Sequence, residues 1–188
     1  MSSPARPIYN GLLAAAAALL AACASGPEIN HDINPAATFG NYKSFGFFSP
    51  LATDKAGYES VFTTRLKDST RRAMESKGYV YSESGSDLLL NFYANVQDKQ
   101  EIRSTPTSMG YYGYRGGYYG GFSTATVETV DYKQGTLSID LVDAQKKILA
   151  WQALAEGRVS SEARKNPGPA IDAVVTRMFV SMPAAGSH

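Results

Sequence analysis

Thr136-Leu137-Ser138-Ile139-Asp140-Leu141-Val142 alternates between apolar and polar side chains, which is the pattern of a strand with one buried face. A polar run of five residues, Asp143–Lys147, follows it. The next segment, Ile148–Arg158, alternates again and places Leu149, Trp151, Ala153 and Ala155 on one side. Two alternating segments joined by a short polar loop predict a β-hairpin.

Three further strands are expected on the N-terminal side of this hairpin. Ser123–Tyr132 is rich in Thr and Val, and Gly135 separates it from the hairpin. Asp87–Val96 again has a period of two, with one face made of Leu88, Leu90, Phe92, Ala94 and Val96. Tyr42–Phe48 is rich in aromatic residues and is followed by Ser49-Pro50, which suits a first strand ended by proline.

Two segments have the spacing of amphipathic helices. In Tyr58–Lys77 one face is expected to hold Phe62, Leu66, Ser69 and Ala73, and Gly78 is suited to end the helix. Pro167-Gly168-Pro169 opens the second helix, because proline fits a first turn. Its apolar stripe, which Pro183 ends, consists of Ile171, Val174, Val175, Met178, Phe179 and Met182.

These elements predict an α+β fold in the order β-α-β-β-β-β-α. We expect an antiparallel sheet of four to five strands with both helices packed on one face. A single domain would then cover residues 41–183, with residues 184–188 as a tail.

The N-terminal region has the features of an export signal. The apolar run Gly11–Ala22 has twelve residues, too few to span a bilayer of about 30 Å. Its end, Leu20-Ala21-Ala22-Cys23, resembles the lipobox of bacterial lipoproteins. The resemblance implies cleavage between Ala22 and Cys23, removal of residues 1–22 and lipid on the Cys23 thiol. Cys23 is the only cysteine in the chain, so a lipidated thiol explains it better than an incidental buried cysteine.

A lipid on Cys23 would hold the protein at a membrane, because two acyl chains already give stable attachment. Residue 24 is Ala rather than the Asp that favours inner-membrane retention, so the resemblance implies the outer membrane with a periplasm-facing domain. Residues 24–38 are rich in Pro, Asn, Gly and Ser, and we expect residues 23–40 to form the lipidated Cys and a flexible tether.

A family resemblance covers nearly all of the remaining chain. The segments that carry it are Asp87–Tyr93, Gly135–Asp143 leading into Leu149-Ala150-Trp151, Asn34–Ala37, Tyr42–Phe45 and Lys77-Gly78-Tyr79. In this order they resemble the domain-of-unknown-function 4136 family of bacterial lipoproteins. The resemblance implies an exported, lipid-anchored single domain with no established activity, ligand or catalytic residue. Ala153-Leu154 after the Trp departs from the pattern, where a charged residue and Gly would be expected.

The sequence offers no constellation of catalytic residues. His31 and His188 are the two histidines and Cys23 is assigned to lipid, which leaves no Ser–His–Asp or Cys–His arrangement and no set of metal ligands. Removing Arg6 with the signal leaves 17 basic and 17 acidic residues, a balance that argues against nucleic acid as a partner. We therefore expect a non-catalytic structural, adaptor or binding module without a cofactor. The alternative is a hydrolase of envelope polymers that uses carboxylates such as Asp140 and Asp143.

The most distinctive segment, Met109–Phe122, holds six glycines and five tyrosines in fourteen residues. Tyrosine supplies flat amphipathic contact surface, so the segment could bind an envelope protein or a glycan. The residues expected to make that contact are Tyr111, Tyr112, Tyr114, Arg115, Tyr118 and Tyr119. The alternative is a spacer of biased composition between two strands.

Overall fold

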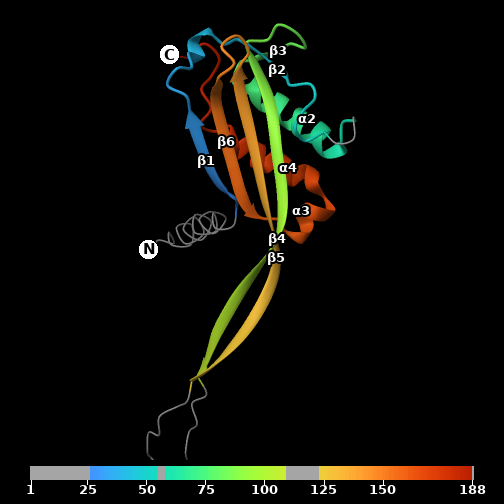
Figure 1. The fold of residues 1–188 in the computed structure, drawn as a ribbon, viewed down its shortest axis with the longest axis vertical. Coiled ribbons are helices and arrows are strands. Elements are labelled where there is room, and N and C mark those ends of the chain that lie inside the picture. The colour runs from blue at the N-terminus through green and yellow to red at the C-terminus, as the bar shows by residue number, and fades with distance from the viewer. Residues whose placement is uncertain (1–25, 55–57, 109–122, 188) are drawn as a thin grey trace, which may run out of the picture.

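The computed structural model describes residues 26–54, 58–108 and 123–187. These residues contain one six-stranded sheet with the strand order β1-β6-β5-β4-β2-β3. Its strands are β1 (Glu28–Ile33), β2 (Ser44–Phe47), β3 (Val80–Tyr81), β4 (Leu88–Ser108), β5 (Ser123–Asp143) and β6 (Leu149–Arg158). Figure 1 shows that β4 and β5 are much longer than their neighbours and extend beyond the rest of the sheet.

The sheet is mixed. β4 and β5 pair antiparallel from Leu88↔Asp143 to Ser108↔Ser123, and β6 pairs antiparallel with both β5 and β1. β2 instead runs parallel to β3 and to β4. The parallel pairing follows from the helix between β2 and β3, because a strand that re-enters the sheet after a crossover runs in the original direction.

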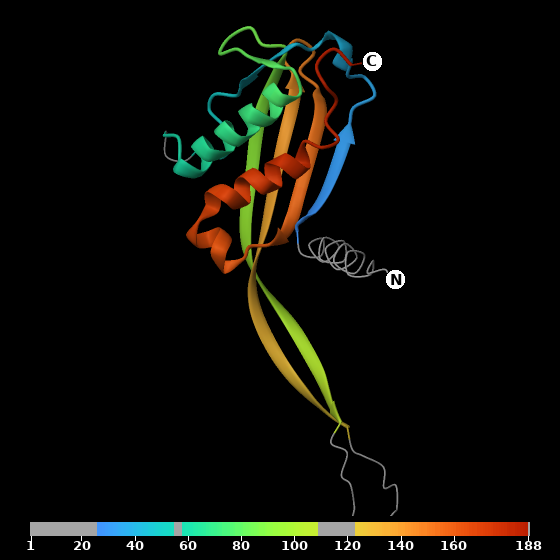
Figure 2. The same ribbon diagram turned by 180° about the vertical axis from the view of Figure 1, so that it is seen from behind.

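The described residues also form three α-helices: α2 (Val61–Ser76), α3 (Ser161–Lys165) and α4 (Pro167–Met178). Figures 1 and 2 show α2 and α4 side by side on one face of the sheet, and the opposite face has no described element over it. The hydroxyl of Ser60 caps α2 by accepting a 3.0 Å hydrogen bond from the backbone N of Thr63. None of the described helices is long and apolar enough to cross a membrane.

The hydrophobic core lies between the sheet and these two helices. Trp151 of β6 is fully buried, and its ring centroid lies 5.2 Å from that of Phe179 at the end of α4. The apolar stripe predicted for the last helix is confirmed as core, since Ile171, Val175, Met178, Phe179 and Met182 are all buried. The other large core side chains are Phe45, Leu66, Met74, Tyr79, Leu88, Leu90, Phe92, Ile139 and Leu141.

The predicted α+β class and the hairpin of residues 136–158 are confirmed, but the details of the sheet differ. It has six strands rather than four or five, and β2 makes it mixed rather than antiparallel. The two strands expected on either side of Gly135 form the single strand β5. Gly135 does not break this strand because it stays extended and pairs with both Val96 and Gly157.

The expectation that residues 23–40 form a tether is wrong for the part that the structure describes. Glu28–Ile33 is strand β1, which pairs with β6 along its whole length. Ile29 packs against the core, and His31 Nε2 lies 2.8 Å from the backbone O of Met178. Phe39, in the 3₁₀ turn Phe39–Asn41, is buried as well.

The face of α2 that packs on the sheet is also shifted from the predicted one. Phe62 is 39% exposed, whereas Thr63 and Thr70 are buried beside Leu66 and Ser69. Thr63 is retained in the interior because its hydroxyl donates a 3.0 Å hydrogen bond to that of Thr53. A buried hydroxyl is tolerated when it is hydrogen-bonded, which hydrophobic periodicity cannot reveal.

Candidate functional site

In the described part of the chain, β4 and β5 continue beyond the other strands of the sheet as a two-stranded arm. β6 stops pairing with β5 at Gln134↔Arg158, and beyond this point β4 and β5 pair only with each other, as far as Ser108↔Ser123. We define the arm as residues 98–108 and 123–133, and Figure 1 shows it projecting from one end of the body. Two-stranded ribbons are marginally stable on their own in water, and none of the arm's described residues belongs to the hydrophobic core.

The arm has two chemically different faces. The face that continues the buried side of β4 holds Val96, Ile102 and Val127, which are 57%, 73% and 64% exposed. Val127 belongs to this face because its register partner, Ser104, is two residues from Ile102. This face thus exposes single apolar side chains that the helices no longer cover, among polar residues such as Gln100 and Asp131.

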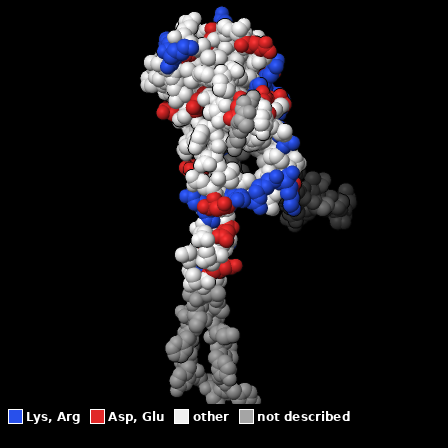
Figure 3. Space-filling model, turned by 45° about the vertical axis from the view of Figure 1, so that its right-hand side comes forward, with Lys and Arg blue, Asp and Glu red and all other residues white. Residues whose placement is uncertain are grey.

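The other face carries a charged cluster at the base of the arm. Arg158 forms an ion pair with Glu101, and its guanidinium lies 4.0 Å from the ring centroid of Tyr132. Arg103 adds a second contact to Glu101, at 3.4 Å. The hydrogen bond from Arg158 lowers the pKa of Glu101 and keeps this carboxylate ionised. Figure 3 shows basic and acidic side chains together where the arm leaves the body.

The predicted contact residues Tyr111, Tyr112, Tyr114, Arg115, Tyr118 and Tyr119 lie outside the described residues, as do Ala22 and Cys23. Their place in the chain is nevertheless informative, because residues 109–122 connect Ser108 to Ser123, the two residues that close the arm. In chain order, residues 109–122 are therefore the connection between the two strands of the arm.

The two carboxylates proposed for a hydrolase have structural partners. Asp143 is buried and accepts hydrogen bonds from the hydroxyl of Tyr42 at 2.8 Å and from the backbone N of Gln145 and Lys146. Burial acts to raise the pKa of Asp143, but these hydrogen bonds outweigh it and lower the pKa. Asp140 accepts bonds from the Ser138 hydroxyl and the Gln152 amide, both at 2.8 Å.

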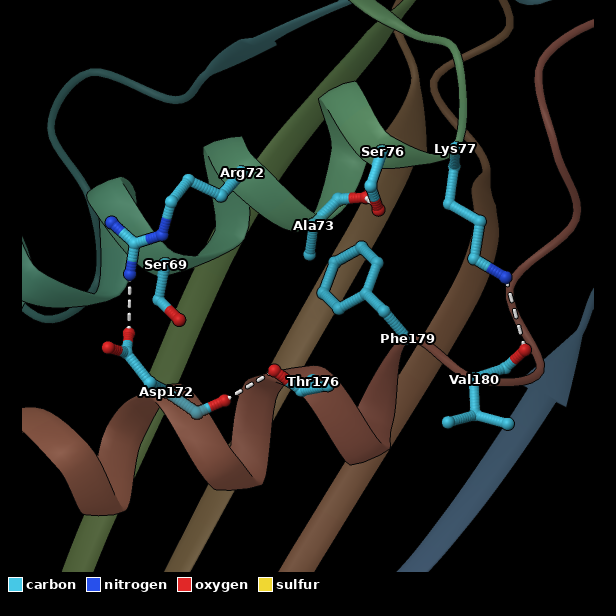
Figure 4. A pocket seen from close by; sticks show the side chains of 9 residues that line it. All are labelled: Ser69, Arg72, Ala73, Ser76, Lys77, Asp172, Thr176, Phe179 and Val180. Carbon is cyan, nitrogen blue, oxygen red and sulfur yellow. Dashed lines mark hydrogen bonds and ion pairs between the residues drawn. The ribbon is translucent and has the colours of Figure 1, made fainter.

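A shallow groove of about 420 Å³ lies between α2 and the C-terminal end of α4. Phe179 forms its apolar floor, and Figure 4 shows Arg72 and Lys77 at its edges. Arg72 pairs with Asp172 at 2.6 Å, and Lys77 donates a 3.1 Å bond to the backbone O of Val180. Asp172 is the one carboxylate among its lining residues, so this groove does not supply the pair that a glycoside hydrolase needs.

His31 has structural contacts as well. Its ring centroid lies 6.1 Å from that of Trp151, and Nε2 faces the last carbonyl of α4, that of Met178. Among the residues that the structure describes, no group of three or more His, Cys, Asp and Glu side chains is arranged to hold a metal ion.

Comparison with known sequences places the chain in a family. The profile of a domain of unknown function, DUF4136, matches residues 29–184, which is most of the chain and includes every described strand except the first residue of β1. The chain belongs to the DUF4136 family. The resemblance read from the sequence is thereby confirmed, and the match includes both strands of the arm. No curated protein matches the sequence of this DUF4136 chain.

Solved structures share the fold of this DUF4136 protein at low sequence identity. A DUF4136 family protein from Bacteroides thetaiotaomicron is 13% identical with a TM-score of 0.53, over 87% of this chain and all of the other. A PDZ domain protein from Parabacteroides distasonis is also 13% identical, with a TM-score of 0.50 over 89% of this chain. The DUF4136 chain spans 39% of the length of that second protein.

The sequence did not reveal the apolar face or the charged cluster of the arm. Gln97–Thr105 is rich in polar residues with low β propensity, so the strand was expected to end at Val96. One available signal was the Thr- and Val-rich segment Ser123–Tyr132, which needs an antiparallel partner of similar length on the other side of residues 109–122. Gln97–Ser108 is that partner.

Proposed function

We propose that this DUF4136 protein is a lipid-anchored, non-catalytic binding module of the cell envelope. In this proposal the lipid on Cys23 attaches it to the outer membrane, and the domain faces the periplasm. The arm presents residues 109–122 to an envelope protein or a glycan. The observation that carries the proposal is the arm itself, which extends eleven residue pairs beyond the last β5–β6 pair without adding to the core.

The arm supports a binding role because its side chains stabilise little of the folded body. Ile102 and Val127 are more than half exposed, so their apolar surface is left free for contacts outside the described fold. The charged cluster of Glu101, Arg103 and Arg158 fixes the base of the arm instead. An arm linked to β6 at its base and open along its length is suited to hold a contact segment away from the body.

The anchor is supported by the lipobox residues and by the position of β1. β1 begins at Glu28, five residues after Cys23, and it is an edge strand of the sheet. A lipidated Cys23 would therefore be joined to the folded body through a very short segment.

The test removes the arm and keeps the body. In the shortened variant an Asn-Gly turn joins Lys99 to Tyr132, which face each other in the register. Wild-type protein, this variant and a Lys146→Ala control would each be purified with lipid from envelope extract, and co-purifying proteins and glycans would be quantified. The proposal predicts that retained components disappear in the shortened variant and remain in the control. Equal retention by all three proteins would contradict it.

A further inference from the structure

The chain enters the body at the same end from which the arm leaves it. Glu28, the first residue of β1, pairs with Glu156, two residues before the end of β6. Pro27 lies against Gly157, and a Cβ added to Gly157 would come within 2.9 Å of the Cα of Pro27. The carbonyl of Pro27 accepts a 3.0 Å hydrogen bond from the guanidinium of Arg177. Arg158 is the residue that pairs with Gln134 at the base of the arm. Figure 1 shows this convergence at the lower end of the body.

The segment that would join the body to the lipid is much shorter than the arm. Four residue steps separate Cys23 from Pro27, and a fully extended chain covers about 14 Å in that number of steps. The arm runs ten steps from Asp98 to Ser108, about 33 Å at the rise of a β-strand. A lipidated Cys23 therefore holds the base of the arm close to the membrane surface. An arm of this length that lay along the surface would contact it over much of its length.

The two faces of the arm determine which side would meet a membrane. Ile102 and Val127 project from the face that no described residue of the body covers. The remaining polar residues of that face include Asp98 and Lys133, which neutralise each other in a 2.6 Å ion pair, and also Gln100 and Asp131. The opposite face carries four charged side chains, Lys99, Glu101, Arg103 and Glu128, against three on the first face, and it also holds Val130 and Tyr132.

We propose that the arm lies against the membrane that holds the lipid of Cys23, with Ile102 and Val127 facing the bilayer. This inference rests on the proposed anchor. The few exposed apolar side chains of this face are too few to bind a free protein to a membrane. Once the anchor is inserted, however, the contact is intramolecular and the high effective concentration makes a weak interaction sufficient. The partner of this face is a lipid surface.

Cys23 is the only cysteine in the sequence, so an introduced cysteine can be labelled selectively. Because the thiol of Cys23 would carry the lipid, Ile102→Cys introduces one free thiol in the full-length lipidated protein. This thiol would be labelled with an environment-sensitive fluorophore, and the protein inserted into vesicles of phosphatidylethanolamine and phosphatidylglycerol with brominated acyl chains. Arg103→Cys is the control on the opposite face. Lys146→Cys, in the turn between β5 and β6, is the control at the other end of the body.

The proposal predicts that bromine quenches the label at position 102 several-fold more than the label at position 146. Quenching at position 103 should be intermediate. Equal quenching at positions 102 and 146 would overturn the proposal. Efficient disulfide formation between two Ile102→Cys proteins without quenching would overturn it too, and would assign this face to a second copy of the chain.

Vesicle flotation separates this inference from the anchor on which it rests. If protein with Cys23 does not float with the vesicles, the proposed anchor itself is wrong. If it floats and a Cys23→Ser protein does not, the anchor holds, and the quenching result then tests the arm alone.

Discussion

The hydroxyl of Tyr42 donates a 2.8 Å hydrogen bond to the carboxylate of Asp143, which joins the segment before β2 to the end of β5. Both residues are buried. Hydrogen bonds to charged groups contribute about 1.5–3 kcal/mol, so Tyr42→Phe should lower the free energy of unfolding by about that amount. Urea unfolding checks this, with Tyr93→Phe as control, because Tyr93 is 55% exposed. A Tyr42→Phe protein as stable as this control would show that the bond contributes nothing.

The stability of the domain should fall at both extremes of pH. Burial acts to raise the pKa of Asp87 and Asp143, but hydrogen bonds from backbone amides and hydroxyls outweigh it and lower both from 3.8. A lowered pKa means that the folded state favours the carboxylate. The stability that these groups contribute is therefore complete above about pH 4 and is lost as the pH falls through the lowered values. In an Asp87→Asn, Asp143→Asn protein the free energy of unfolding should fall less steeply as the pH is lowered. The same pH dependence as in the wild type would contradict the stabilising role of these two carboxylates.

At alkaline pH the dependence is reversed, and the stability of the folded state falls as the pH rises. Burial, and then the bond to Asp143, raise the pKa of Tyr42 from 10.0 to about 12. The folded state thus favours the protonated hydroxyl, and its contribution is present below about pH 10 and is lost as the pH rises toward 12. Unfolding followed from pH 8 upward, with Tyr42→Phe for comparison, measures this loss; the variant should lose less stability than wild type.

The last helix should be essential to the fold. Met178 is completely buried, and replacing a buried Met by Ala costs about 2–5 kcal/mol, a large share of a domain stability of about 5–15 kcal/mol. Met178→Ala should therefore lower the thermal transition markedly. Val180→Ala is the control, since Val180 is 72% exposed. Equal transitions for the two variants would mean that the helix does not close the core.

Hydrophobic periodicity predicted the elements that pack on the core with one apolar face. The stripe from Ile171 to Met182 and the alternation around Trp151 are of this kind, because burial alone selects their residues. It failed where other interactions decide the structure. Glu28–Ile33 is a strand because it completes an edge of the sheet beside β6, a pairing that no local pattern signals. The parallel direction of β2 likewise depends on how α2 crosses the sheet.

The sequence predicted the tyrosines of the candidate site but not the two-stranded arm that leads to them. The tyrosines of residues 109–122 are evident in the sequence, whereas the arm that leads to them is built from polar residues that resemble a loop. Its strands are held by cross-strand pairs such as Asp98 with Lys133, which stabilise a ribbon only once the two segments are in register. Pairing between distant segments cannot be read from either segment alone.

The lipid anchor should depend on one atom, the sulfur of Cys23. Cys23→Ser should abolish incorporation of labelled fatty acid and release the protein from the membrane fraction, because two acyl chains supply nearly all the attachment. An Ala24→Ser protein is the matched control and should keep both properties. Equal labelling of the Cys23→Ser protein would disprove the anchor.

The proposed function requires residues 109–122 to bind an envelope component. Replacing residues 110–121 with a short Gly/Ser linker and measuring what the lipidated protein retains from envelope extract tests it most directly. The melting temperature of the same variant is the control for folding, and it should be unchanged, because loop closure changes by only about 0.6 kcal/mol per doubling of length. We predict an unchanged melting temperature with lost retention. Unchanged retention would contradict the claim and leave these residues a spacer.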